Sequence, residues 1–332
     1  MNQPCAFAYG RVMDRVRLFK KTASVSPCLA ALLLIYSWTT ALARETPEPS
    51  KPAAPAPAPL PDAKPPWGRI VVVGASASAG FVGSEPLGGP QTPKHRLSRY
   101  LDAALLVPHE PVRNLANAFF FTHPEEIGRR QIDEIIKTNP TLVVGVDFLF
   151  WFCYGNEAKT DEERGARFEA GLKLLERIPC PLIVGDIPDA SSAVGGVLSE
   201  EEMPSPSAIY VANRRLKEWA VQHPQVTVVS LSSFMHSLMA NEPLTLRGQT
   251  LSEIKTRKLL QSDKLHPTAQ GSTLLALVVL DAFQSHQPNV PAEDIRWDSE
   301  QVYQMGFNAT PTPAKNPAKP ATEPAASAPA GK

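Results

Sequence analysis

Residues 67–307 predict an α/β fold, a parallel sheet of five strands with helices packed on both of its faces. Five short runs are rich in Val, Ile and Leu, and longer segments with helical periodicity separate them. Strands that alternate with helices imply parallel pairing, because each helix carries the chain back to the same end of the sheet. The stretch of about 240 residues is long enough for one well-buried domain.

The strands are expected where the apolar runs are continuous, as in strands that are buried on both faces. The first run, Arg69 to Val73, ends at Gly74. The second is weaker, and the third ends in Gly145-Val-Asp147. The five predicted strands are 69–73, 112–116, 142–147, 181–185 and 226–230.

The helices are expected between these runs and after the last of them. Pro124 lies near the start of one helix, with acidic residues in its first turn, as helix starts favour. Leu216 and Trp219 lie three residues apart on one face of another. The last helix is strongly apolar and closes the domain. The predicted helices are 95–106, 124–137, 160–177, 205–222 and 268–284.

The N-terminus has the pattern of a secretory signal peptide over residues 1–43. Five basic residues and one acid precede an apolar run from Leu29 to Trp38, and Ala41-Leu-Ala43 offers a cleavage site. The run is short for a membrane span, which needs about 20 residues. We therefore expect a periplasmic or secreted protein, with an uncleaved N-terminal anchor as the alternative and Met13 as an alternative start.

The Pro/Ala-rich stretches 44–66 and 308–332 are expected to be disordered linker and tail. They hold 9 and 6 of the 34 prolines and too few apolar side chains to form a core. The whole chain has 33 basic and 33 acidic residues, and a nucleic-acid partner would favour a basic excess. Two cysteines, Cys153 and Cys180, follow the signal. They are expected at opposite ends of neighbouring strands, too far apart for a disulfide, and so to be free.

Ligands of such sheets bind at the carboxyl ends of the strands, where Gly74 to Gly80 (GASASAG) follows the first strand. Small residues allow a sharp turn that holds the Ser76 hydroxyl above the sheet edge. The alternatives are a tight turn with capping serines and a phosphate-binding loop, although the spacings of a P-loop and of a dinucleotide site are absent.

Asp263-x-x-His266 precedes the last helix, with Pro267 expected at its first position. Asp263 can accept from Nδ1 of His266, which leaves Nε2 to face a serine, as a catalytic triad requires. Helix caps use the same residue types, so this motif is also compatible with a structural role.

Together the two segments resemble the first and last motif blocks of the SGNH, or GDSL-type, hydrolases. Ser76 falls on the nucleophile position, and Asp263 and His266 fall on the family's Asp-x-x-His. The resemblance implies a flavodoxin-like three-layer α/β/α sandwich and a Ser-His-Asp triad that acts on esters without a metal or cofactor.

The middle blocks depart from the family pattern. Ala75 replaces the usual Asp, and residues 114–118 lack the second-block glycine, so Ala118 and Asn117 are the tentative oxyanion donors there. In the third block Asp147 replaces the usual Asn, and a carboxylate donates only when it is protonated. Counting residues from Pro140 instead puts Phe150 at that position. Asn156 is a further candidate donor.

Two aromatic clusters, 118–121 and 148–152, are expected near the same edge, either as an acyl or aryl pocket or as core beneath the loops. The sequence thus favours an exported serine hydrolase acting on a small-molecule, glycan or lipid ester. The alternatives are an acyltransferase with the same triad and a non-catalytic protein that binds an acylated envelope component. Contact with the membrane is expected only through the signal segment.

Overall fold

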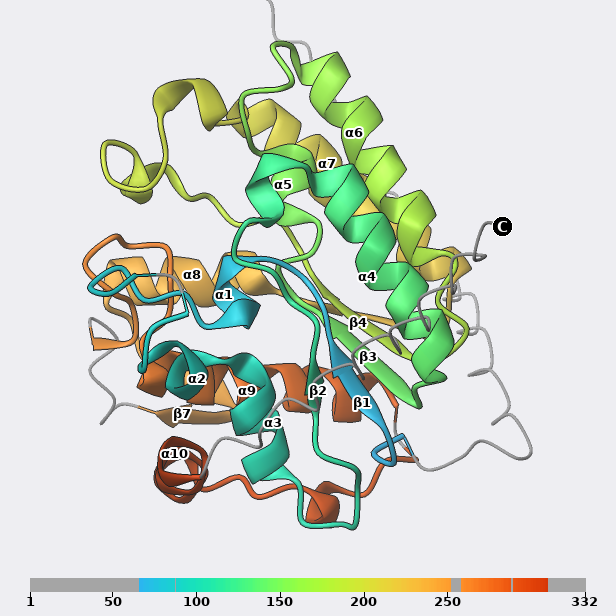
Figure 1. Cartoon of the computed structure of the whole chain (residues 1–332), viewed down its shortest axis with the longest axis vertical. Helices are drawn as coiled ribbons and strands as arrows, with labels where there is room; N and C mark the ends of the chain where they lie inside the picture. Colours follow the sequence, from blue (N-terminus) through green and yellow to red (C-terminus); the bar gives the residue numbers. More distant parts are fainter. Residues whose placement is uncertain (1–65, 87, 252–257, 288, 310–332) are drawn as a thin grey trace, which may run out of the picture. The chain divides into compact units, whose positions relative to one another are not determined.

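In the computed structural model, residues 66–86, 88–251, 258–287 and 289–309 are described (Figure 1). The predicted signal peptide, nearly all of the first Pro/Ala stretch and most of the second lie outside these residues. The boundaries predicted for those segments therefore remain predictions.

A five-stranded parallel sheet forms the centre of the described domain, as the sequence predicts. Its strands lie in the order β2-β1-β3-β4-β5, which is the flavodoxin-like order. They are β1 Ile70–Val72, β2 Arg113–Asn114, β3 Leu142–Gly145, β4 Leu182–Gly185 and β5 Val226–Val229.

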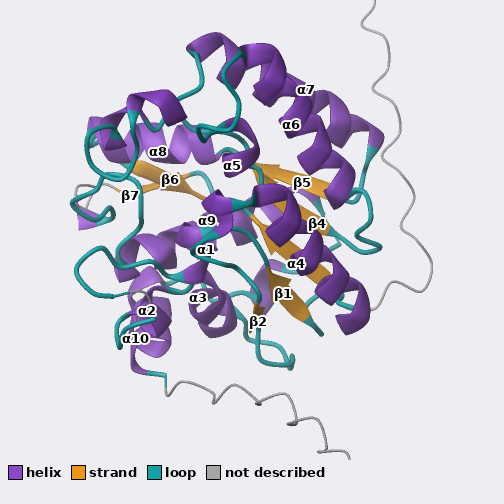
Figure 2. Cartoon of the chain, turned by 45° about the horizontal axis from the view of Figure 1, so that its top comes forward, coloured by secondary structure: helices purple, strands orange, loops and turns teal. Residues whose placement is uncertain are grey.

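Helices cover both faces of this sheet (Figures 1 and 2). Two separate apolar clusters of buried side chains lie between the helices and the sheet. In β1, Ile70 and Val72 join one cluster, while Val71 joins the other. One layer contains α4 Pro124–Thr138, α5 Phe150–Cys153, α6 Asp161–Leu175 and α7 Pro206–Gln222. The other contains α3 Leu97–Ala104, α8 Leu231–Ala240, α9 Ala269–His286 and α10 Ser299–Asn308. The α/β class and the three-layer arrangement predicted from the sequence are thereby confirmed.

The predicted helix 95–106 is wrong as a single element. The structure has α2 Thr92–His95 and α3, separated by Arg96, whose backbone is extended (φ −62°, ψ 129°). The Ser272 hydroxyl donates to the carbonyl of His95 at 2.9 Å, which satisfies one of the carbonyls freed by this break. The last helix also begins later than predicted. Thr268 is its N-cap and Ala269 its first residue, so Pro267 lies outside it.

Several elements were not predicted. They are α1 Ser76–Ala79, the helices α5, α8 and α10, and a hairpin of β6 Leu244–Leu246 and β7 Gln249–Leu251. Short 3₁₀ turns at 120–122, 191–193, 200–202 and 292–294 complete the described connections.

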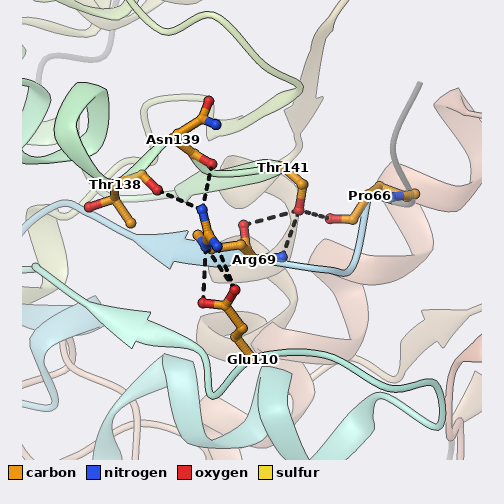
Figure 3. Close-up of polar contacts among 6 residues, drawn as sticks. All are labelled: Pro66, Arg69, Glu110, Thr138, Asn139 and Thr141. Atoms are coloured by element: carbon orange, nitrogen blue, oxygen red, sulfur yellow. Dashed lines mark hydrogen bonds and ion pairs between the residues drawn. The ribbon is translucent and has the colours of Figure 1, made fainter. Parts of the chain in front are cut away.

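The amino end of β1 is anchored by Arg69 (Figure 3). Its guanidinium donates to Glu110 at 2.6 Å and to the carbonyl of Thr138 at 3.0 Å. Its backbone N–H donates to Oγ1 of Thr141 at 2.8 Å, and that hydroxyl is also 3.0 Å from the carbonyl of Pro66. These contacts fix the entry of the chain into β1, and thereby the place where the strand delivers the turn that follows it.

Candidate active site

The turn after β1 brings Ser76 to the carboxyl edge of the sheet. Gly74 has φ +124°, and a Cβ atom there would lie 2.1 Å from Oδ1 of Asp147, so no other residue fits without a shift of the backbone. The side-chain amide of Gln131 in α4 accepts from the N–H of Gly74 and donates to its carbonyl, both at 2.9 Å. Ser76 is then the first residue of α1.

Ser76, His266 and Asp263 form one continuous chain of hydrogen bonds. Oγ of Ser76 lies 2.8 Å from Nε2 of His266, and Nδ1 of His266 lies 2.8 Å from Oδ2 of Asp263. Ser76 and His266 lie 190 positions apart in the sequence, whereas Asp263 and His266 lie 3 apart. The imidazole is only 5% exposed, so it can exchange protons with little competition from bulk water.

Asp263 is held in place as a carboxylate. Its Oδ1 accepts from the N–H groups of Leu265 and His266, both at 3.0 Å. Burial favours the neutral acid, but the hydrogen bonds from the His266 side chain and from these two N–H groups together lower the pKa of Asp263 below its ordinary value. An ionised Asp263 fixes the tautomer in which Nδ1 carries the proton and Nε2 accepts from Ser76.

Two further residues hold His266 in position, and the sequence analysis missed both. The amide of Gln261 donates to the carbonyls of Phe81 and Pro267 at 2.7 and 2.9 Å and accepts from the N–H of Gly83 at 3.0 Å. The ring of Phe81 packs against the imidazole at 4.3 Å between centroids, with the two ring planes tilted by 41°. Gln261 thus ties the segment that follows α1 to the loop that carries the base.

Asp147 lies directly behind the Ser76 turn and is buried there, with 7% of its surface exposed. Oδ2 accepts from the N–H of Ser78 at 2.9 Å, and Oδ1 accepts from its hydroxyl at 2.6 Å. Burial raises the pKa of Asp147, and the bonds from Ser78 work against this rise. Because both of its oxygens accept hydrogen bonds from Ser78, the Asp147 side chain stabilises the turn that carries Ser76.

The other candidate oxyanion donors differ in whether their N–H groups already have an acceptor. The N–H of Asn117 donates to the carbonyl of Gly74, and its Oδ1 accepts from Phe119 at 2.8 Å. The N–H groups of Ser76, Ala77 and Ala118 have no acceptor among the described residues. Asn156 is exposed and is not part of the pocket wall described next.

An apolar pocket opens beside Ser76. Some 590 Å³ of space free of protein atoms lies here, a volume that includes open solvent at the mouth. Ser76, Asp147 and His266 are the polar side chains in its wall. The remaining lining residues are Ala75, Ala77, Val146, Phe150, Trp151, Pro188, Leu231, Phe234, Met235, Leu260, Leu265, Pro267 and Leu275.

The two aromatic clusters of the sequence divide between pocket, core and surface. Phe150 and Trp151 line the pocket. Phe120, Phe148 and Phe152 pack edge-to-face or stacked against one another in the core, at centroid distances of 5.3 to 6.0 Å. Phe119 and Phe121 are 51% and 44% exposed.

Cys153 ends α5 in the core, and Cys180 precedes β4; both are free, as predicted, although Cys180 is only half-buried. Within the described ranges, no group of three or more His, Cys, Asp or Glu side chains is arranged to hold a metal ion. No helix in the described part of the chain has the length and apolar character needed to cross a membrane.

No family model and no curated protein matches this chain. A search of solved structures matches this chain to a gut microbial diltiazem-metabolizing enzyme (13% identity, TM-score 0.42), where the match covers 65% of this chain but only 46% of that one. A psychrotrophic esterase from a Pseudoalteromonas species has 13% identity and TM-score 0.42, with 67% of this chain and 100% of that one covered. A GDSL-like lipase from Bacteroides thetaiotaomicron has 14% identity and TM-score 0.39, with 66% and 88% covered.

Proposed function

We propose that this chain is an exported serine hydrolase that cleaves an ester through an acyl-enzyme on Ser76, without a metal ion. The single observation that carries the proposal is the unbroken hydrogen-bonded chain from Ser76 through His266 to Asp263 beside an apolar pocket. The export part of the proposal is supported by the sequence pattern of residues 1–43 alone. It predicts that the mature protein begins near Arg44, which mass spectrometry of its N-terminus in the native host would test.

In this mechanism Nε2 of His266 takes the proton of Ser76 as Oγ attacks the ester carbonyl. The imidazolium then gives that proton to the leaving alcohol. Asp263 keeps the imidazole oriented and stabilises its charged form. Water, activated by the same Nε2, then cleaves the acyl-enzyme.

The negative charge that develops on the carbonyl oxygen needs hydrogen-bond donors. In this proposal the donors are the unpaired backbone N–H groups of Ser76, Ala77 and Ala118. The side chain at position 147 is a carboxylate and supplies no amide N–H. Loss of one such donor typically costs about 10²–10³ in rate. We therefore expect a slow enzyme, whose best substrates are esters with good leaving groups.

A fluorophosphonate probe tests the proposal, because it labels serines that are activated by a base. We expect labelling of the wild type, none of Ser76→Ala, and slower labelling of Asp263→Asn. Ser230→Ala is the matched control, because Ser230 lies at the same edge of the sheet and bonds to Ser233 and Asp186 but to no histidine. Labelling that survives Ser76→Ala would reject Ser76 as the nucleophile.

The engaged carboxylate of Asp147, in place of an amide donor, favours one alternative, a non-catalytic protein that binds an acylated envelope component. That alternative expects acyl-ligand binding by a protein that the probe does not label. An acyltransferase would instead be labelled and would pass the acyl group to an added alcohol in preference to water.

A further inference from the structure

The apolar pocket beside Ser76 extends across the carboxyl ends of four neighbouring strands. Ser76 follows β1, Val146 directly follows β3, Pro188 follows β4 and Leu231 begins the helix that follows β5. Since β1, β3, β4 and β5 are adjacent in this order, the lining residues form a track that starts at the serine.

The two walls of the track come from different layers of the fold. Phe150 and Trp151 belong to the apolar cluster on the α4–α7 face. Leu231, Phe234 and Met235 of α8 belong to the cluster on the α9 face. A ligand in the pocket therefore lies between the two cores, where it meets side chains that are held by dense packing.

The chemistry of the walls excludes polar and charged groups. Asp147 is the charged side chain of the lining, and both of its oxygens are already bonded to Ser78. A sugar or a charged acyl group would lose its hydrogen bonds to water here, and beyond the triad the lining side chains offer only the indole N–H of Trp151 in return. A hydrocarbon chain gains about 25 cal/mol for each Å² that it buries.

The order of the reaction assigns this pocket to the acyl part of the ester. The alcohol must leave and water must enter before the acyl-enzyme can turn over, so the alcohol side has to stay open. The acyl group stays bound to Ser76 while the alcohol leaves and while water attacks. The pocket can therefore hold the acyl group throughout the reaction.

The strand spacing sets the length of the acyl chain. Neighbouring strands lie about 4.8 Å apart, so the three steps from β1 to β5 span about 14 Å. An extended chain advances roughly 1.2 Å per bond, from about 3.3–3.6 Å for each three-bond residue. The track therefore fits an unbranched chain of roughly ten to twelve carbons.

We propose that the substrate is an ester of an unbranched, uncharged, medium-length fatty acid, whose chain lies along this track and ends at Leu231. This assignment rests on the function proposed above. In its covalent step the Ser76 Oγ–acyl bond forms, the acyl–alkoxy bond breaks, and the serine proton passes through His266 to the alcohol. Water then releases the fatty acid and restores the Ser76 hydroxyl.

A series of p-nitrophenyl esters from C2 to C16, each below its aggregation concentration, tests the assignment. We expect kcat/KM to rise two- to fourfold for each added methylene and to level off at about ten to twelve carbons. Ethyl decanoate should react faster than decyl acetate, because only the former puts its chain on the acyl side.

Two substitutions at Leu231 should move the optimum in opposite directions. Leu231→Trp fills the far end, so the kcat/KM ratio of the C10 to the C4 ester should fall at least tenfold. Leu231→Ala opens the end and should move the optimum to longer chains. Met239→Trp is the matched control, because Met239 lies on the same helix, is 38% exposed and is not in the pocket wall; it should leave the ratio unchanged.

A flat chain-length profile, a preference for decyl acetate, or an unchanged ratio in both folded Leu231 variants would overturn the assignment while Ser76 labelling still supports the hydrolase. Absence of Ser76 labelling would overturn the proposed function, and the acyl track with it.

Discussion

Asp147 has a different role in the structure from the one that the sequence suggests. From the sequence it stands where the family has an oxyanion-donating Asn, so Asp147→Asn would be expected to restore a donor and raise the rate. In the structure its two oxygens accept from two donors of Ser78. An amide keeps one acceptor for the N–H of Ser78 but turns its NH₂ group toward the hydroxyl, which must then accept, so both charge-assisted bonds to the carboxylate are lost.

We therefore expect Asp147→Asn to lower kcat/KM by about tenfold or more, because the Ser76 turn loses its support. Ser78→Ala should lower it less, and the double variant should be far from additive, since the two residues share one contact. The measurement is a double-mutant cycle on a p-nitrophenyl ester. A higher rate in folded Asp147→Asn would restore the donor role that the sequence suggested.

Gln261 gives a second prediction at this scale. Gln261→Ala removes the bonds to Phe81, Gly83 and Pro267 and should lower kcat roughly ten- to hundredfold with little change in KM, because a base displaced by about 1 Å loses that much. Steady-state kinetics and the rate of fluorophosphonate labelling measure the effect. Gln222→Ala, on the exposed end of α7, is the control. A change confined to KM would assign Gln261 to substrate binding instead.

The lowered pKa of Asp263 predicts a pH dependence of stability. A carboxyl whose pKa is lower in the folded state stabilises the fold above its ordinary value of 3.8, and this contribution is lost as the pH falls through the lower folded value. The difference in Tm between the wild type and Asp263→Asn should therefore be largest near neutral pH and shrink below about pH 4. A difference that grows as the pH falls would mean that Asp263 is not held as a carboxylate.

At the scale of elements, the sequence predicts what local pattern determines. All five strands are found within two residues of their predicted bounds, because a buried parallel strand is a continuous apolar run. The short helix α5 (FWFC) has no polar face and therefore no periodicity to recognise. Arg96 interrupts a stretch of good helical period, because its neighbour His95 pairs with Ser272, 177 residues away. The Asp-x-x-His motif is local and readable, whereas Gln261 acts on Phe81 across 180 residues.

Arg164 in α6 joins three elements of one layer. It is only 5% exposed, and its guanidinium donates to the carbonyls of Cys153, Gly155 and Glu201 at 2.9 to 3.1 Å. Arg164→Met leaves these carbonyls without their donor and should lower the free energy of unfolding by roughly 3 kcal/mol. Urea unfolding measures this.

The control is Arg130→Met, since Arg130 is 74% exposed and pairs with Glu126 on the surface of α4; it should change stability by less than about 0.5 kcal/mol. Because α5 carries Phe150 and Trp151, Arg164→Met should also weaken the preference for long acyl chains. An Arg164→Met protein as stable as the control would mean that water satisfies the carbonyls.

At the scale of the whole molecule, the domain is closed by its two ends. Trp67 is buried, and its indole donates to Asp294 at 2.9 Å. At the other end α10 packs on α3. Val302 is fully buried, and a Cβ atom at Gly306 would lie 2.5 Å from the ring of Tyr100. The contacts of this end with α3 continue to residue 309, because Arg99 donates to the carbonyl of Ala309.

This closure predicts how the chain responds to truncation. A fragment of residues 66–309 contains all the contacts described here and should keep the Tm and the Ser76 labelling of the full chain. A fragment of residues 66–298 lacks α10 and uncovers Tyr100 on α3, which should cost several kcal/mol at about 1.5–3 kcal/mol for each large apolar side chain exposed. The loss should reach the active site, because Asn114 joins the carbonyl of Ser78 to the hydroxyl of Ser98 on α3. Calorimetry and probe labelling of the two fragments make the comparison; equal stability would show that α10 is an appendage and that the core is complete at residue 298.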